Sequence, residues 1–292
     1  MIHISMRKTV DGQALANEVK SAVQNEISQL GLAGKINFTA VIVGELGTSL
    51  QYLEKKQQAC EEVGIVMRVI KLDKDVTQDK LETTLKKLSD DRNVHAILLQ
   101  LPVPVGLNTR KAIKCIEPTK DVDGLTYTNF GRLVQGHASL IPCAAQAVMH
   151  ILRAHNIPIE GADAVVIGRS YTVGRAVAAL LQLENASVAV CHRSTRDIAS
   201  YTQRADIIVV AAGHQGALTA SMVKYGAAVI DVGINRLKKS GRIIGDVDFD
   251  EVSKKTGLIT PVPGGVGPIT TAFLLRNILT AHKLHTNKIA RR

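Results

Sequence analysis

The most constraining feature of this sequence is a regular alternation between short apolar runs and longer segments of helical period. The runs 38–43, 65–70 and 95–99 are rich in Val, Ile, Leu and Phe, and glycines such as Gly44 and Gly64 stand at the junctions. Between them, apolar residues recur every three or four positions, which indicates amphipathic helices. Strands that alternate with helices in this way form parallel sheets covered by helices. The sequence therefore predicts an α/β fold.

The alternation restarts after an irregular stretch, which predicts a second domain. Its expected strands lie at residues 164–167, 187–191, 207–211 and 228–232. The first helix of the chain is expected to begin after Asp11, which serves as its N-cap. Further helices are expected near residues 48–63, 81–88, 144–154 and 270–282. A chain of 292 residues can bury two ordinary cores. We expect an N-terminal α/β domain over 1–140, joined by a C-terminal helix at 268–285, and a Rossmann-like parallel-sheet nucleotide-binding domain over 141–267.

The charge of the chain leaves its partner open. A net charge of +10 is compatible with nucleic-acid binding, but only 3% of residues are aromatic, tryptophan is missing and no known nucleic-acid-binding module is recognisable. A phosphate-bearing small molecule accounts for a basic protein equally well. We expect no nucleic-acid partner, and a basic nucleic-acid binder stays as an alternative whose binding would weaken steeply with salt.

Targeting and cysteine patterns favour a cytoplasmic protein. No apolar run reaches the roughly 18 residues that a membrane span needs, and the N-terminal residues lack the apolar core of a signal peptide. The four cysteines (Cys60, Cys115, Cys143 and Cys191) form no C-x-x-C pair. We therefore expect small buried thiols in a reducing compartment, without a disulfide framework or a metal site.

A glycine turn between an apolar strand and a helix suggests a nucleotide site. Gly168, Arg169, Ser170 and Gly174 form this turn. Glycines let a diphosphate approach the backbone, and the start of a helix offers unpaired N–H groups. The spacing departs from the usual G-x-G-x-x-G, so a tight turn without any ligand is the alternative.

The end of the next strand bears on the choice of cofactor. NAD-binding domains commonly carry a carboxylate there, which holds the ribose 2′-hydroxyl. This chain has Arg193 and Ser194 instead. A carboxylate would repel a 2′-phosphate, whereas Arg193 and Arg169 would attract it. We therefore favour NADP over NAD, with a solvated loop arginine as the alternative.

Three polar residues share one face of the helix predicted after Gly44. Ser49, Tyr52 and Lys56 stand at i, i+3 and i+7, with Tyr52 and Lys56 one turn apart. Such a pair is common by chance, and a surface lysine lying along a tyrosine is the alternative. Other segments of the chain decide between the two.

Seven segments occur in a fixed order between residues 44 and 268: SLQYLEKKQQACEEVGI, LLQLPVP, KDVDG, VVIGRS with VGR, IDVGINR, GDVDF and PVPGGVGP. In this order they resemble the bifunctional methylenetetrahydrofolate dehydrogenase/methenyltetrahydrofolate cyclohydrolase family. The resemblance implies a homodimeric enzyme of one-carbon metabolism and purine biosynthesis. Residues 1–140 would form its α/β folate-binding catalytic domain and residues 141–267 its Rossmann-like NADP-binding domain, with a cleft between them. The enzyme would oxidise 5,10-methylenetetrahydrofolate with NADP and then hydrolyse the methenyl product to 10-formyltetrahydrofolate.

The resemblance also implies roles for residues of the first domain. Lys56 resembles the essential lysine that moves the proton in hydrolysis, and Tyr52 the platform on which the folate stacks. Gln100 corresponds to the residue that tunes this lysine, and Asp123 to the carboxylate that holds the pterin. Ser49 is expected to assist by hydrogen bonding.

Further positions are assigned to ligand binding by the same resemblance. Substrate contacts are expected from Leu101, Pro263, Gly264, Gly265 and Gly267. In addition to the glycine turn, Arg193 and Ser194, cofactor contacts are expected from Ile234 and Thr270.

Three departures from the family pattern leave alternatives open. Residues 142–147 read PCAAQA where the family often has P-C-T-P-x-G, the turn GRSYTVGRAV differs from the commoner form, and residues 45–48 vary. The lost threonine hydroxyl bears on the cofactor and not on Lys56 or Asp123. A member with a single activity and a non-catalytic nucleotide-binding regulatory paralogue are therefore the alternatives.

Overall fold

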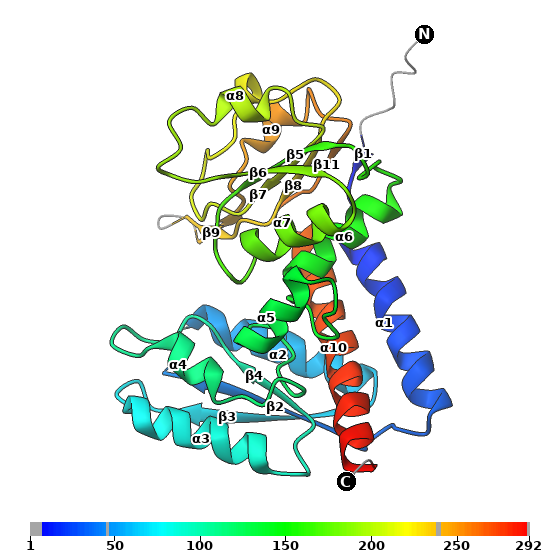
Figure 1. Cartoon of the computed structure of the whole chain (residues 1–292), viewed down its shortest axis with the longest axis vertical. Coiled ribbons are helices and arrows are strands. Elements are labelled where there is room, and N and C mark those ends of the chain that lie inside the picture. The colour runs from blue at the N-terminus through cyan, green and yellow to red at the C-terminus, as the bar shows by residue number, and fades with distance from the viewer. Residues whose placement is uncertain (1–7, 45–46, 238–240, 291–292) are drawn as a thin grey trace. The chain divides into compact units, whose positions relative to one another are not determined.

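The computed structural model describes residues 8–44, 47–237 and 241–290, without the side chains of 47–52 and 287–290. Two compact units make up the chain (Figure 1). The small-sheet unit contains Asn17–Cys143 and the chain from Thr271 onward, and the large-sheet unit contains the chain up to Ala16 and Ala144–Thr270.

The small-sheet unit is built on three parallel strands. These are β2 (Ile36–Val43), β3 (Ile65–Leu72) and β4 (Ala96–Leu99), in the order β3-β2-β4. Its helices are α2 (Gly47–Glu62), α3 (Gln78–Asp90), α4 (Thr109–Lys114) and α5 (Tyr127–Val134). Helices α1 (Gly12–Gln29) and α10 (Val266–Ala290) continue across the boundary between the units, each with at least one turn in both.

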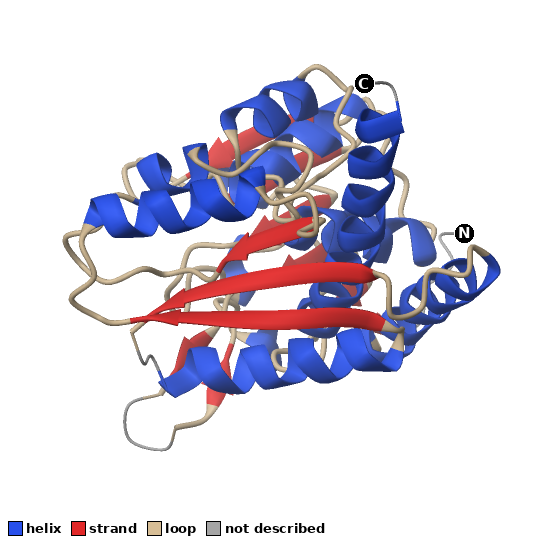
Figure 2. Cartoon of the chain, turned by 90° about the horizontal axis from the view of Figure 1, so that it is seen from below, coloured by secondary structure: helices blue, strands red, loops and turns tan. Residues whose placement is uncertain are grey.

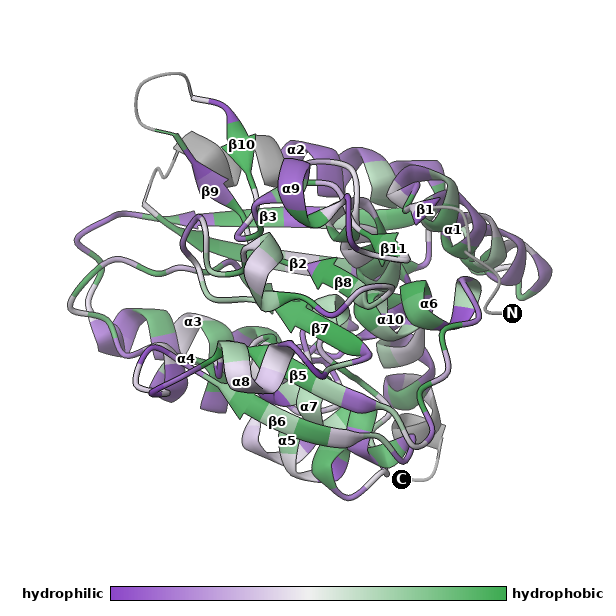
Figure 3. Cartoon of the chain, turned by 90° about the horizontal axis from the view of Figure 1, so that it is seen from above, coloured by the Kyte–Doolittle hydropathy of each residue, from purple (hydrophilic) through white to green (hydrophobic). Residues whose placement is uncertain are grey.

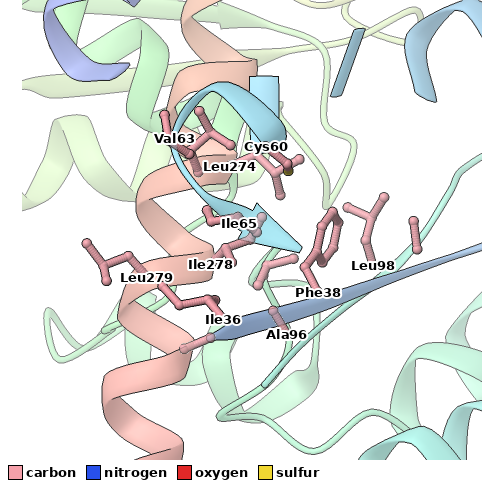
Figure 4. Close-up of a cluster of buried hydrophobic side chains, with 14 of the residues drawn as sticks. Ile36, Phe38, Cys60, Val63, Ile65, Ala96, Leu98, Leu274, Ile278 and Leu279 are labelled. Carbon is pink, nitrogen blue, oxygen red and sulfur yellow. The ribbon is translucent and has the colours of Figure 1, made fainter. Parts of the chain in front are cut away.

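Helix α10 closes the core of the small-sheet unit. Figure 4 shows Leu274, Ile278 and Leu279 of α10 beside side chains of the sheet, among them Ile36 and Ile65. All five are at most 3% exposed. Burying a side chain of this size contributes about 1.5–3 kcal/mol. The C-terminal helix therefore belongs to the hydrophobic core of the unit that also carries β2, β3 and β4.

The large-sheet unit contains a six-stranded sheet in which all pairs are parallel. The strands, in spatial order, are β1 (Lys8–Thr9), β11 (Leu258–Ile259), β8 (Ala228–Asp231), β7 (Ile207–Val210), β5 (Asp163–Ile167) and β6 (Ser187–Cys191). A short antiparallel pair, β9 (Asn235–Arg236) and β10 (Ile243–Ile244), follows β8. The helical segments are α6 (Cys143–Ala154), α7 (Gly174–Leu183), α8 (Ala199–Thr202), η1 (Ala220–Met222) and α9 (Phe249–Val252).

The strand order of this sheet locates its binding edge. The chain passes from β5 to β6 on one side and then returns to β7 on the other side. Ligands of open parallel sheets bind outside the carboxyl ends of the strands, at such a reversal. Strands β7 and β8 are coloured mainly as hydrophobic in Figure 3, as expected for strands buried on both faces. Figure 2 shows the strands of both units in red among blue helices.

The predicted α/β fold with two parallel-sheet domains is confirmed. The predicted N-cap is also present, because Asp11 Oδ1 accepts hydrogen bonds from the amides of Gln13 and Ala14, both at 3.0 Å. The units differ from the predicted limits at the amino end, where β1 pairs with β11 and so joins the large-sheet unit rather than a domain over 1–140. The binding role of each domain and the cleft stay predictions.

All four cysteines are free; Cys60, Cys143 and Cys191 are buried, as predicted, and Cys115 is half-buried. Among the described residues, no three or more His, Cys, Asp or Glu side chains are grouped as a metal site would require. Within the same part of the chain, no helix is both long enough and apolar enough to cross a membrane.

Candidate active site

Lys56 and Gln100 form the centre of the candidate site in the small-sheet unit. Lys56 lies on α2, and its Nζ donates a hydrogen bond of 2.8 Å to Gln100 Oε1. Gln100 follows β4 directly, and its backbone amide donates to Val41 O at 2.8 Å, which continues the sheet by one residue. Its side-chain amide donates to Leu101 O at 2.9 Å. The oxygen of Gln100 is therefore turned toward the lysine by the geometry of the strand end.

Asp123 is the second ionisable group of this site. Burial raises the pKa of Asp123 to about 6, the positive charge of Lys56 lowers it and the charge of Asp121 raises it again. The thiol of Cys143 lies 4.0 Å from Oδ1 of its carboxylate. Hydrogen-bond donors on a ligand would stabilise the ionised form of a carboxylate in this environment.

Neighbouring residues of the KDVDG segment hold the backbone that carries Asp123. The Nζ of Lys120 donates to Ser89 O and Asp91 O, both at 2.7 Å, and to Leu88 O at 3.4 Å. These carbonyls lie at the end of α3, where helix carbonyls lack partners within the helix. Lys120 therefore ties the start of the segment to α3.

Asp121 fixes the other side of the segment. Its Oδ2 accepts hydrogen bonds from the amide of Thr126 at 2.7 Å and from Asn129 Nδ2 at 3.0 Å. Thr126 is the N-cap of α5, with its hydroxyl accepting from the Asn129 amide. Lys120 and Asp121 therefore have structural roles. Asp123 is the acidic residue of this segment whose pKa is lowered by the positive charge of Lys56.

Asn277 of α10 connects this segment to the start of α6. Its Nδ2 donates to Val122 O and Ile141 O, both at 2.8 Å, and lies 3.5 Å from Cys143 Sγ. Asn277 is 2% exposed, and an unpaired carbonyl buried at this place would cost about 1–3 kcal/mol. Sequence analysis missed Asn277. The signal that could have identified it is an asparagine inside the apolar helix pattern FLLRNILTAH.

The remaining predicted residues of this region are described in part. Ser49 and Tyr52 belong to helix α2, but their side chains lie outside the described residues. Leu101 follows Gln100, is half-buried and precedes a cis proline peptide bond. The structure therefore brings together Lys56, Gln100 and Asp123 of the predicted set.

In the large-sheet unit, the predicted glycine turn joins β5 to α7. A Cβ on Gly168 would lie 2.1 Å from Ala211 O, and a Cβ on Gly174 would lie 2.1 Å from Gly168 O. Only glycine permits these backbone approaches. Ser170 Oγ accepts from the amides of Val173 at 3.2 Å and Gly174 at 3.4 Å, and so caps the start of α7. The turn therefore has the glycine-lined backbone that a diphosphate requires.

Arg193, Ser194 and Ile234, which are also predicted to contact the cofactor, follow strands of the same sheet at their carboxyl ends. Arg169, Arg193 and Ser194 are exposed, the last two in the loop after β6. The Gly168 amide donates to Cys191 O at 2.8 Å, which joins the glycine turn to the end of β6. Ile234 follows β8 and is 57% exposed. An open, basic edge without a carboxylate after β6 fits a nucleotide with a 2′-phosphate.

The glycine-proline turn follows β11 in the large-sheet unit. Pro263, Gly264 and Gly267 are exposed, whereas Gly265 is buried. Gly264 O accepts a hydrogen bond of 3.0 Å from the Gly12 amide. Thr270 lies in α10, and its hydroxyl donates to Val266 O of the same helix at 3.1 Å. The roles predicted for these residues stay predictions.

Comparison with known proteins identifies the family of the chain. Two family models match: the tetrahydrofolate dehydrogenase/cyclohydrolase catalytic domain over residues 10–123, and its NAD(P)-binding domain over residues 142–286. The chain is 45% identical to the bifunctional protein FolD of Campylobacter jejuni over 280 residues, covering 95% of this chain and 99% of the relative. It is 43% identical to the bifunctional protein FolD of Nautilia profundicola, covering 94% and 96%.

Solved structures show the same relationship. The crystal structure of FolD methylenetetrahydrofolate dehydrogenase/cyclohydrolase from Campylobacter jejuni matches with a TM-score of 0.91 at 44% identity, covering 95% of this chain and 99% of that chain. The Trypanosoma brucei enzyme, in complex with NADP and an inhibitor, matches with a TM-score of 0.90 at 37% identity, covering 96% and 98%. The chain belongs to the tetrahydrofolate dehydrogenase/cyclohydrolase family.

Proposed function

We propose that this protein oxidises 5,10-methylenetetrahydrofolate with NADP and hydrolyses the methenyl product to 10-formyltetrahydrofolate. The observation that carries the proposal is the hydrogen bond of 2.8 Å between Lys56 Nζ and Gln100 Oε1, with Asp123 close enough for its pKa to respond to the lysine. Membership of a family with a catalytic and an NAD(P)-binding domain supports both half-reactions.

Oxidation depends on the positioning of the substrate. NADP, when bound, supplies the hydride acceptor. Asp123 is assigned to hold the pterin, because its carboxylate can accept hydrogen bonds from the amino edge of the ring. The turn from Gly168 to Gly174 is assigned to the diphosphate, and Arg193 to the 2′-phosphate. Oxidation of the methylene carbon gives a delocalised cation and needs no proton transfer, so Lys56 is not required to move a proton in this step.

Hydrolysis depends on proton transfer. Water adds to the methenyl carbon, and protons have to move as the ring opens. Lys56 Nζ is the group assigned to this transfer. Gln100 holds the lysine through a neutral oxygen. A carboxylate at position 100 would form an ion pair and retain the proton on the lysine, so the amide suits a lysine that must exchange protons.

Two further properties are proposed, the oligomeric state and the compartment. The protein is inferred to act as a homodimer because its family resemblance implies one. It is inferred to act in the cytoplasm because its four cysteines are free, as in reducing compartments. Both stay predictions.

The first test is an assay of both half-reactions with the purified protein. With methylenetetrahydrofolate, reduction of NADP is expected to exceed reduction of NAD, and added methenyltetrahydrofolate is expected to be hydrolysed without any nicotinamide cofactor. Absorbance of the reduced nicotinamide and of the methenyl group reports the two rates. Hydrolysis without oxidation, or the reverse, would identify a member with a single activity, and neither would indicate the regulatory paralogue.

Lys56→Met is expected to abolish hydrolysis because it removes the group that transfers the proton. A loss of about 100-fold or more in the rate of methenyl hydrolysis is expected, whereas folate binding, measured by calorimetry, should persist. Lys55→Met is the matched control, since Lys55 is the exposed neighbour on the same helix. Hydrolysis at the normal rate in Lys56→Met would remove the assignment.

Asp123→Asn is expected to stabilise the fold and weaken folate binding. Burial raises the pKa of Asp123 from 3.8 to about 6, so its ionisation costs the folded state free energy as the pH rises through this window. The full cost, about 3 kcal/mol, is present above pH 6 and fades toward pH 4. Urea unfolding should therefore show the variant to be more stable at about pH 8 and nearly equal to the wild type at about pH 4. The exposed Asp75→Asn should show neither effect, and an equal gain at both pH values would contradict the assignment.

Arg193→Asp is expected to move cofactor preference from NADP toward NAD, because the new carboxylate repels a 2′-phosphate and accepts from a 2′-hydroxyl. The ratio of kcat/KM for the two cofactors measures the change. Arg204→Asp makes the same charge change at an exposed position before β7, at the opposite edge of the sheet. An unchanged ratio in Arg193→Asp would mean that another residue recognises the phosphate.

A further inference from the structure

The segments IDVGINR and GDVDF place two buried aspartates in the large-sheet unit. Asp231 ends β8 and is 3% exposed, and Asp246 follows β10 and is 0% exposed. Burying a carboxylate is costly unless hydrogen bonds satisfy it. The proposed function gives neither residue a role. Their hydrogen bonds indicate what they hold.

Asp231 holds the segment that contains Asp246. Its Oδ1 accepts from the amides of Gly233 at 2.9 Å and Asp246 at 3.1 Å, and its Oδ2 accepts from Val247 at 2.9 Å. A Cβ on Gly245 would lie 1.9 Å from Asp231 Oδ2. The chain that returns from β10 is therefore fixed against the end of β8 by this carboxylate.

Asp246 in turn holds the loop that follows β7. Its Oδ2 accepts from the amides of Ala212 at 2.7 Å and Gly213 at 2.8 Å. Its Oδ1 accepts from Asn235 Nδ2 at 2.7 Å. One carboxylate oxygen therefore binds two successive amides of this loop. This fixes the position and the direction of the loop backbone.

The loop after β7 determines the space at the glycine turn. Ala211 precedes the two amides that Asp246 binds, and its carbonyl oxygen would lie 2.1 Å from a Cβ on Gly168. The carbonyl oxygen of Gly168 would in turn lie 2.1 Å from a Cβ on Gly174, at the start of α7. A displacement of the β7 loop would therefore be transmitted by direct contact to the backbone that is assigned to the cofactor diphosphate.

We propose that Asp246, held in place by Asp231, is a positioning residue that sets the β7 loop and the glycine turn in the arrangement that binds NADP. The inference rests on the proposed function in so far as NADP is the cofactor. Both aspartates lie at the carboxyl edge of the parallel sheet, where such sheets bind their ligands. The carboxylate of Asp206 serves as a contrast, since it accepts from the Asp163 amide at 3.0 Å at the beginning of β5 and so lies at the opposite edge.

Asp246→Asn tests the proposal in the full-length protein. An asparagine offers a single acceptor oxygen, so either the two loop amides or the Asn235 amide would face an NH₂ group. NADP binding, measured by calorimetry without folate, is expected to weaken by about tenfold or more, since hydrogen bonds to charged groups are the strong ones. Asp206→Asn is the matched control and should bind NADP like the wild type.

Two activities of the same variant separate positioning from general damage. Methenyl hydrolysis needs no nicotinamide cofactor, and Lys56 and Gln100, which are assigned to it, belong to the small-sheet unit together with Asp123, which is assigned to hold the pterin. Asp246→Asn should therefore raise the KM for NADP in oxidation while hydrolysis stays within about twofold of the wild type. Unchanged NADP binding would overturn the proposal, as would an equal loss of hydrolysis. If the wild type itself shows no NADP-dependent oxidation, the proposed function fails instead.

A measurement on the wild type covers the case in which Asp246→Asn does not fold. The amides of Ala212 and Gly213 are expected to be protected from hydrogen exchange in the absence of NADP, because Asp246 already binds them. Rapid exchange that slows only on addition of NADP would show that the cofactor orders the loop. That result would contradict positioning by Asp246.

Discussion

Lys120 is buried, and its ammonium group is tolerated there because three carbonyl oxygens at the end of α3 accept its hydrogen bonds. The next residue, Asp121, is equally buried and is satisfied by an amide at the start of α5 and by the Asn129 side chain. Removing either set of partners would leave an uncompensated charge, which costs several kcal/mol. Two buried charges therefore fix the backbone from which Asp123 projects.

The contrast between these charges and Asp123 separates structure from function. Lys120 and Asp121 are each held by several hydrogen bonds within the fold. Asp123 lies on the same segment, and burial raises its pKa more than the charge of Lys56 lowers it. A carboxylate whose pKa is raised by burial is suited to accept hydrogen bonds from a ligand, and such perturbed groups are typical of functional sites.

The main elements of the fold could be predicted because their patterns are long and local. Strand β2 was predicted from Phe38 to Val43 and spans Ile36–Val43, and α6 was predicted within one residue of its observed start. The two-residue strands β1 and β11 could not be predicted, since a pair such as Lys8–Thr9 has no periodicity and becomes a strand only through its parallel partner. The limits of the two units differ from the predicted domains for the same reason.

The candidate site could be predicted where a residue type implies its chemistry. The roles of Lys56, Gln100 and Asp123 were assigned because their segments resemble those of the family, and in the structure Lys56 binds Gln100 and its charge lowers the pKa of Asp123. Asn277 and Asp246 were missed because their partners are backbone groups distant in sequence, 155 residues away for Val122 and 34 for Ala212. A sequence can show that a polar residue stands in an apolar pattern, but only the fold shows which carbonyl or amide it satisfies.

The two half-reactions make different demands on these contacts. Hydrolysis requires one lysine whose proton can leave and return, and the residues assigned to it form a compact set around the Lys56–Gln100 hydrogen bond. Oxidation requires a cofactor held in register, so it depends on backbone placement over several loops, from Asp231 through Asp246 to Ala211 and Gly168. A substitution in the first set removes a chemical group, whereas one in the second set changes geometry. Because the Lys56–Gln100 pair and the Asp231–Asp246 contacts belong to different units, we expect a substitution in either set to affect its own half-reaction first.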